Sequence, residues 1–433
     1  MTAQSGNDPD RTEWFRDVGF GLFLHWGPSS QLGSALSWPI EDASEEFRDA
    51  YRSTSRTFDP TDYDPERWAR LAALAGMGYV VFTSKHHDGF CMFDSEYTEF
   101  DVSNTPYGGD VAGELADAFR SAGLGVGFYY SPPDLEYQRA TGNSPGSIRD
   151  PDYERAFEEW TDPYGPEEVG FLDYETAQVE ELLTNYGDVD VLFFDSFGSC
   201  EPLKEHAWAV DADVVVSRGE MDTPELTFEG LPEEIHDEPW EACMTMQRRS
   251  WAAKPAPAYG DDDFHSWKPA RLLIERLVET RAKGGNLLLN VGPQADGTLP
   301  DAAVDRLRNL AYWNAVHGDA VHAVRPWVTS DEGDGDVWFT REKDEDTVYA
   351  VFDPGWSAVD EEHETTVSLE SVEATEDTTA RLLGRPTDAE WTQREERLDV
   401  TVRSGDQPLY SWYWPRYDWP VAVRLTDVRP AGE

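Results

Sequence analysis

Short apolar runs alternate with amphipathic segments over most of the chain. Runs that carry few polar residues are typical of strands buried on both faces of a parallel sheet. They occupy residues 19–24, 79–83, 125–130, 189–194, 213–217 and 285–291. A seventh strand is indicated from Trp240, and the pattern shows no eighth strand. Each of these runs is short enough to be a strand and too short to be a complete buried helix.

The segments between these runs have apolar residues at helical spacing. The clearest begins at Asp64 and Pro65, a capping residue followed by a residue preset for the first helical turn. Helices are also predicted over residues 111–122, 168–186 and 269–282. Alternating strands and helices predict an α/β fold with a parallel sheet. No phosphate-binding glycine fingerprint follows the first strand, so an irregular (β/α)8 barrel of the TIM type is favoured over a doubly wound sheet.

The pattern changes after about residue 325. Strand character recurs at residues 336–340, 347–352 and 421–425, separated by acidic, turn-rich stretches. Such spacing predicts a small C-terminal antiparallel β-sandwich domain. We therefore expect a polar N-terminal segment at 1–13, a catalytic barrel at 14–323 and a β domain at 324–433.

The charge of the chain is extreme. Asp and Glu number 86 against 35 Lys and Arg, which gives a formal net charge of -51. Repulsion of this size destabilises a compact state at low salt and disfavours nucleic acid and anionic membranes as partners. The acids are spread along the whole chain, which indicates a surface adapted to a salty cytoplasm. The polar N-terminus lacks an apolar signal-peptide core, and no apolar run approaches the roughly 18 residues of a membrane span.

Three cysteines, Cys91, Cys200 and Cys243, are widely spaced. An odd number at such spacing predicts neither a disulfide framework nor a zinc motif. We expect them to be small buried apolar residues.

Reactive side chains follow several of the predicted strands. The run Lys85-His86-His87-Asp88-Gly89 comes directly after the strand at 79–83. Barrel enzymes carry their chemistry at the C-terminal ends of strands. Two adjacent histidines can face one pocket only if the chain has left strand geometry, since neighbouring strand residues point to opposite faces.

Two further strand ends carry residues of the same kind. Asp195 follows the strand at 189–194, and its carboxylate could serve as nucleophile, general base, metal ligand or loop cap. His25 follows the first strand, where it could equally be a hydrogen-bonded core histidine.

Glycosidases pair two carboxyl groups, so a second one is expected beyond Asp195. Glu241 is favoured, because the neighbouring Trp240 would remove water from its carboxylate and raise its pKa, as a general acid requires. Glu225 is the second choice.

In order along the chain, these motifs resemble those of the α-L-fucosidases of glycoside hydrolase family 29. The resemblance covers residues 14 to 320. It is carried by GLFLHWG at 21–27, FTSKHHDGF at 82–90, DS at 94–95, NTP at 104–106, FYYS at 128–131, FFD at 193–195, WEAC at 240–243 and KGGNLLLNVGP at 283–293.

The resemblance implies a retaining exo-glycosidase with no cofactor and no metal, acting on a fucosylated oligosaccharide or glycoside. It makes Asp195 the nucleophile and places the acid/base most plausibly at Glu241. The sugar pocket would use His25, His86, His87, and Tyr129 or Tyr130, with aromatic side chains as its apolar wall and Trp240 nearby. The aromatic wall is expected to include Trp38 and Phe193. Oligomeric state is left open.

Two positions depart from the family pattern. Ser37-Trp38 stands where many members have Glu-Trp, and Phe193 stands where many have Trp. Two other functions therefore stay open. One is a metal-dependent barrel hydrolase that uses His25, His86, His87 and Asp195, and the other is a sugar-binding barrel without turnover.

Overall fold

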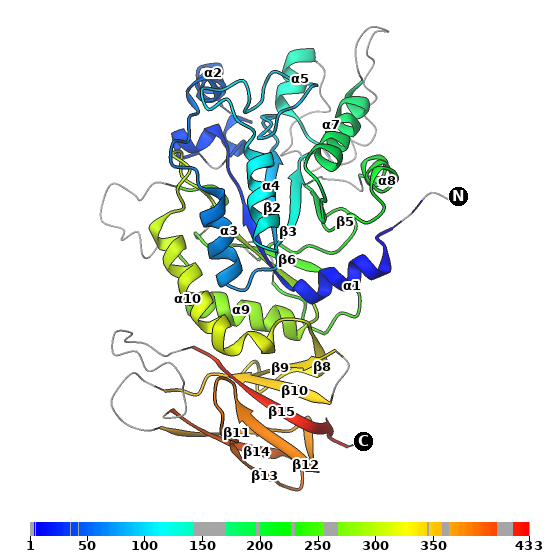
Figure 1. Ribbon diagram of the computed structural model, residues 1–433, viewed down its shortest axis with the longest axis vertical. Coiled ribbons are helices and arrows are strands. Elements are labelled where there is room, and N and C mark those ends of the chain that lie inside the picture. Colours follow the sequence, from blue (N-terminus) through cyan, green and yellow to red (C-terminus); the bar gives the residue numbers. More distant parts are fainter. Residues whose placement is uncertain are drawn as a thin grey trace.

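A computed structural model describes most of the chain. The described residues are 4, 6–34, 36–41, 43–142, 170–195, 200–226, 230–248, 250–254, 267–343, 346–356, 363–404 and 419–432. Figure 1 shows a larger unit built from the N-terminal residues, stacked on a smaller all-β unit. None of the helices in these ranges is long and apolar enough to cross a membrane.

A seven-stranded parallel sheet forms the centre of the larger unit. Its strands lie in the order β5-β4-β3-β2-β1-β7-β6. Within them, every residue except Gly125 is buried, which is why the runs are mostly apolar. The strands are β1 (Phe20–Leu24), β2 (Tyr79–Lys85), β3 (Gly125–Tyr130), β4 (Val191–Phe194), β5 (Val215–Val216), β6 (Glu241–Thr245) and β7 (Asn286–Val291).

An extended segment lies between the two edges of this sheet. Asp222 forms a parallel bridge with Trp240, and Glu225 forms another with Cys243, so residues 222–225 run alongside β6. Arg218, just after β5, bridges Met221. The segment thus occupies the place of the strand that the sequence does not show, and the predicted irregular barrel is confirmed.

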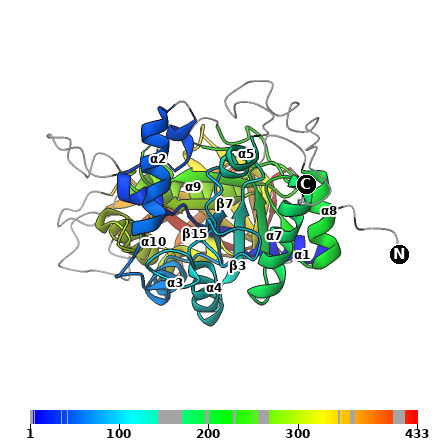
Figure 2. The ribbon, with the colours of Figure 1, turned by 90° about the horizontal axis from the view of Figure 1, so that it is seen from above.

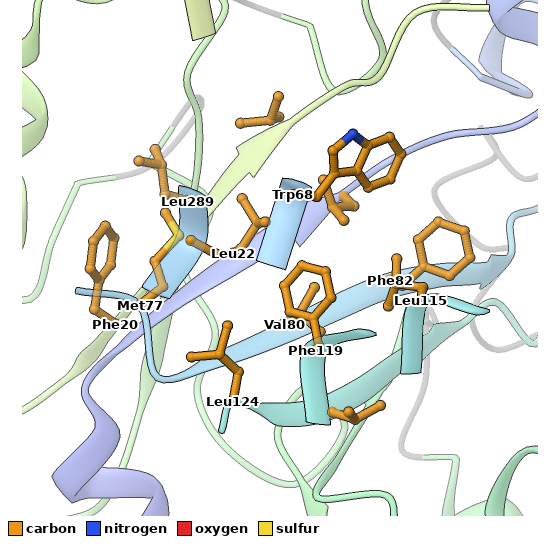
Figure 3. Close-up of a cluster of buried hydrophobic side chains, with 14 of the residues drawn as sticks. Phe20, Leu22, Trp68, Met77, Val80, Phe82, Leu115, Phe119, Leu124 and Leu289 are labelled. Carbon is orange, nitrogen blue, oxygen red and sulfur yellow. The ribbon is translucent and has the colours of Figure 1, made fainter. Parts of the chain in front are cut away.

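Helices surround the strands when the barrel is seen from above (Figure 2). They are α3 (Pro65–Leu74), α4 (Val111–Ser121), α7 (Phe171–Asn185), α8 (Glu201–Val210), α9 (Ala270–Ala282) and α10 (Asp301–His317), with the shorter α2 (Glu45–Ser53) and α5 (Leu135–Thr141) above the strand ends. Apolar side chains of β1, β2, α3 and α4 interlock in the core between sheet and helices (Figure 3). Burial of this kind contributes about 25 cal/mol per Å² of apolar surface and drives the layered arrangement.

The N-terminal end of the barrel is closed by α1 (Pro9–Val18). Phe15 of this helix joins the apolar cluster inside the barrel and packs on Tyr79, with ring centroids 5.5 Å apart. Asn286 of β7 donates a hydrogen bond from Nδ2 to the carbonyl of Phe15 at 2.7 Å. This end is therefore filled, and the opposite end is the one that faces outward.

The C-terminal unit consists of two antiparallel sheets. The larger sheet has the order β12-β15-β10-β9-β8 and the smaller has β11-β14-β13, and apolar residues from both share one core. Their strands are β8 (Val324–Glu332), β9 (Val337–Glu342), β10 (Thr347–Phe352), β11 (Glu364–Leu369), β12 (Val372–Leu382), β13 (Glu390–Gln393), β14 (Leu398–Arg403) and β15 (Val421–Pro430). The predicted β domain is confirmed.

All three cysteines have free thiols. Cys91 and Cys243 are buried, as predicted, whereas Cys200 is half-buried.

Candidate active site

Asp195 is held at the C-terminal end of β4 by three neighbours. The Tyr129 hydroxyl donates to its Oδ2 at 2.5 Å. Arg218 Nε lies 3.4 Å from Oδ1, and His87 Nε2 lies 3.6 Å from Oδ2. The carboxylate keeps 22% of its side-chain surface exposed, so it faces an opening at the end of the barrel where chemistry is expected.

The surroundings of Asp195 favour its charged form. Burial by itself would raise the pKa of the carboxyl, but Arg218, His87, the Tyr129 hydroxyl and His25 outweigh it and lower the pKa. A carboxylate that is ionised at neutral pH and fixed by hydrogen bonds is suited to nucleophilic attack.

His86 and His87 both lie beside Asp195, because β2 ends at Lys85, directly before them. The pairing of β2 with β3 is already irregular between Thr83 and Lys85. The two rings lie 4.3 Å apart, centroid to centroid. The sequence predicts that two adjacent histidines can face one pocket only where the chain has left strand geometry. The structure meets this condition at His86 and His87.

Each histidine of the site has a fixed hydrogen-bond partner. His25 Nδ1 lies 2.7 Å from Asn290 Oδ1, and His86 Nδ1 bonds to Ser37 Oγ. Burial lowers the pKa of His25 and of His87 to about 4 each and that of His86 well below its usual value. All three rings are therefore neutral at pH 7, and each can accept one hydrogen bond and donate another.

The tautomer of His87 follows from a chain of hydrogen bonds. Ser131 Oγ lies 2.9 Å from the carbonyl oxygen of Pro133 and 2.5 Å from His87 Nδ1, and its hydroxyl has a single proton to give to one of them. Which of the two accepts that proton determines the nitrogen that carries the ring proton of His87. Nε2 of the same ring faces Asp195 at 3.6 Å, so the tautomer sets whether His87 presents a proton or a lone pair to the carboxylate.

Aromatic rings line the remaining walls. Tyr129 stacks on Phe193, with centroids 5.6 Å apart, and Trp38 meets His87 edge-on at 5.2 Å. Trp251 lies 4.9 Å from His25 in the same cluster. Rings in this arrangement supply the apolar surface that a sugar methyl group needs.

Two residues predicted for the pocket lie elsewhere. Tyr130 points to the other face of β3, where its hydroxyl donates to Gln178 of α7 at 2.8 Å. The alternation of strand side chains explains this, since Tyr129 already faces the interior. Trp240 is 1% exposed in the outer core, and its Nε1 donates to the carbonyl of Lys283 at 3.3 Å.

Glu241 lies at the wrong end of the barrel for acid/base work on a substrate held by Asp195. It is the first residue of β6 and pairs in register with Asn286, the first residue of β7. Asp195 instead follows Phe194, which pairs with the last residue of β3. Glu241 is fully buried and accepts a hydrogen bond from the Tyr79 hydroxyl.

Burial raises the pKa of Glu241 to about 7. The sequence suggested this raised pKa, but the buried carboxyl has no access to substrate. This carboxyl makes stability depend on pH. The folded chain binds the Glu241 proton more tightly than the unfolded chain does. The contribution of Glu241 to the free energy of unfolding is therefore full below pH 4.5 and is lost as pH rises through about 7.

We expect Glu241→Gln to remove this pH-dependent loss of unfolding free energy. The loss amounts to about 3 kcal/mol at 1.36 kcal/mol per pKa unit. Urea unfolding of both proteins between pH 4.5 and 8 measures the difference in slope. Parallel pH curves for wild type and variant would contradict this account of Glu241.

Glu225, the second choice, lies close to Asp195. Arg218 Nη1 is 2.9 Å from Glu225 Oε1, while Nε of the same guanidinium contacts Asp195. Both carboxylates and the guanidinium are about one-quarter exposed, which shows that they face open space rather than the core. The bridge between Glu225 and Cys243 of β6 fixes this position.

Reasoning from the sequence missed Arg218, Asn290 and Trp251 as members of the site. Arg218 follows the short strand β5 and Asn290 lies near the end of β7, so both carry the strand-end signal that marked Asp195. Trp251 lies in a loop beyond β6, where no regular pattern exists to reveal it.

Three of the predicted metal ligands lie together. In the described part of the chain, one ligand atom is offered by each of His86, His87 and Asp195. These three atoms lie within 4.8 Å of one another. Arg218 already contributes a positive charge to Asp195, which opposes a cation there.

The family model described as "Alpha-L-fucosidase" matches residues 1–319. The chain belongs to this family. Among curated relatives, an α-L-fucosidase of Branchiostoma floridae is 28% identical over 93% of this chain and 91% of its own length. A plasma α-L-fucosidase of Homo sapiens is 28% identical over 78% of this chain and 75% of its own.

Solved fucosidase structures share the fold. The α-L-fucosidase isoenzyme 1 of Paenibacillus thiaminolyticus is 29% identical, with a TM-score of 0.74, and the match covers 96% of this chain and 98% of that one. A Thermotoga maritima α-fucosidase is 26% identical over 96% of both chains, with a TM-score of 0.73. Barrel and C-terminal β unit are thus both features of this fucosidase family.

Proposed function

We propose that the protein is a retaining exo-α-L-fucosidase acting on fucosylated oligosaccharides or glycosides. Membership of the family supports this function, and one observation on this chain carries the mechanism. The ionised carboxylate of Asp195 and the carboxyl group of Glu225 contact the same guanidinium, that of Arg218, at the open end of the barrel.

The proposed reaction has two displacements. Asp195 Oδ attacks the anomeric carbon while Glu225 transfers its proton to the departing glycosidic oxygen, so a C–O bond to the enzyme replaces the bond to the aglycone. Water then gives a proton to Glu225 and attacks the same carbon, which releases fucose and restores Asp195. Arg218 balances the charge of Asp195 before the first step, and that of Glu225 while Asp195 is held as the uncharged glycosyl ester.

The pocket walls suit a terminal 6-deoxy sugar. Neutral His25, His86 and His87 offer donors and acceptors to the hydroxyl groups. Trp38, Tyr129 and Trp251 provide apolar surface around them. The histidines and Tyr129 are buried, which keeps them fixed in place for a terminal sugar residue.

Hydrolysis of an aryl α-L-fucoside followed by proton NMR tests the function and its stereochemistry together. Retention requires the α-anomer of free fucose to appear before mutarotation. First appearance of the β-anomer would contradict the mechanism.

Fucose binding without hydrolysis by folded protein would favour the sugar-binding alternative. Loss of turnover on chelation, with recovery on adding zinc, would favour the metal-dependent alternative at His86, His87 and Asp195.

The acidic composition leads us to propose adaptation to a salt-rich cytoplasm. With 86 acidic and 35 basic residues, repulsion should destabilise the fold until salt screens it. We expect the thermal midpoint to rise markedly from about 0.1 M to about 2 M KCl, as the Debye length falls from about 10 Å to below about 3 Å. Differential scanning fluorimetry measures the midpoint, with sucrose as the uncharged control. A midpoint insensitive to KCl would contradict this adaptation, and fractionation of the source cells tests the location.

A further inference from the structure

Directly behind His86 and His87 of the pocket lies a buried ion pair that the reaction does not use. Lys85 Nζ is 3.0 Å from Asp134 Oδ2, and the two side chains are 0% and 1% exposed. The ammonium also lies over the rings of Tyr130 and Tyr174, at 4.3 and 5.5 Å from their centroids. Lys85 is the first residue of the Lys-His-His-Asp-Gly motif, so the motif extends beyond the pocket.

Stability alone gives a weak reason for this pair. Removing two charges from water costs several kcal/mol per ion, and apolar replacements of buried pairs are often neutral or stabilising. The geometry around the pair suggests another purpose, because it connects two segments of the site. Gly89 belongs to the same connection, since its φ of +80° and its lack of a side chain leave room for Asp134.

Residues 131–135 are bound to residues 85–87 at successive points. The Ser131 amide donates to the carbonyl of Lys85 at 3.0 Å, and the Leu135 amide donates to the carbonyl of His87 at 2.8 Å. Between these backbone bonds stands the Lys85–Asp134 ion pair. Asp134 also caps α5, accepting a hydrogen bond from the Tyr137 amide at 2.8 Å. Asp134 is thus held from two directions.

The carbonyl that orients Ser131 belongs to the residue before Asp134. Ser131 Oγ contacts the Pro133 carbonyl oxygen at 2.9 Å and His87 Nδ1 at 2.5 Å. Moving Asp134 would move the Pro133 carbonyl and free the Ser131 hydroxyl to turn. His87 could then exchange the proton between its two nitrogens and present the wrong one to the pocket.

We propose that the Lys85–Asp134 ion pair is a positioning device that fixes the tautomer and ring orientation of His87. Its value for catalysis rests on the proposed fucosidase function, whereas its effect on His87 does not. Lys85 and Asp134 touch no substrate and act only through Ser131 and His87.

The test uses the neutral double variant Lys85→Met/Asp134→Asn. Asparagine can still cap α5, and removing both charges leaves neither one buried alone, so the protein should fold with a thermal midpoint close to that of wild type. We expect kcat/KM on an aryl α-L-fucoside to fall about 100-fold, the effect of a small misplacement in a site. Histidine 15N NMR should show a change in the ratio of the two His87 tautomers without any substrate. Lys283→Met/Glu279→Gln is the matched control, because that pair, 3.0 Å apart, lies at the C-terminal end of α9, outside the site.

Ser131→Ala provides a second route to the same conclusion. It removes the hydroxyl that contacts His87 Nδ1 and leaves the ion pair intact, so it should reproduce the NMR change. Adding it to the double variant should lower kcat/KM little further, since both act through one contact. Wild-type kcat/KM and an unchanged His87 spectrum in the folded double variant would overturn the proposal. An inactive wild type would refute the proposed function instead, and the NMR result would still decide the tautomer.

Discussion

Asp195→Asn is expected to abolish fucoside hydrolysis while the fold remains intact. The amide keeps the shape of the side chain and can still accept from the Tyr129 hydroxyl, but it cannot form the glycosyl-enzyme bond. Loss of a catalytic nucleophile is expected to lower kcat by about 10⁴-fold or more. Steady-state kinetics on an aryl α-L-fucoside measures the loss, with circular dichroism and the thermal midpoint as checks on folding.

The covalent step can be observed directly. A 2-fluoro fucosyl fluoride should glycosylate Asp195 of the wild type with loss of fluoride and add one fluorofucosyl mass to the peptide that carries Asp195, and it should leave the variant unmodified. Asp190 is the control position, since its carboxylate is paired with Arg11 at 2.6 Å outside the site. Turnover by Asp195→Asn at the wild-type rate, or label on another residue, would refute the assignment of the nucleophile.

Glu225→Gln is expected to discriminate between leaving groups. A dinitrophenolate departs without protonation, so the first step should stay near the wild-type rate on such a fucoside. A sugar or methyl leaving group needs the proton, and kcat/KM should fall about 10²- to 10⁴-fold. Kinetics on both substrates measures this split, the difference in rate loss between the two leaving groups. Added azide takes the place of the activated water.

Glu241→Gln is the matched variant for this experiment. Its carboxyl is buried at the far end of the barrel with Tyr79, so we expect wild-type kinetics on both substrates. If Glu241→Gln shows the split between leaving groups and Glu225→Gln does not, the acid/base returns to Glu241.

Local sequence determined much of this protein. The apolar runs specify strands buried on both faces, and the residues that directly follow them, Asp195, His86 and His87, end at the open mouth because all the strands are parallel. Such residues can be recognised because their position depends only on the strand that precedes them. The change of pattern after residue 325 likewise marked the β domain.

Tertiary structure alone decided which glutamate accompanies Asp195. Glu241 and Glu225 are both acidic residues near strands, and the flanking Trp240 favoured Glu241, which the fold places at the other end of the barrel from Asp195. The difference arises from register, since Glu241 begins β6 whereas Glu225 bridges Cys243 and meets Arg218, which also contacts Asp195. These contacts join separate strands, and no local pattern encodes them. Burial of Glu241 produced the pKa of a general acid at a place that substrate cannot reach, because desolvation raises a carboxyl pKa wherever the chain encloses it.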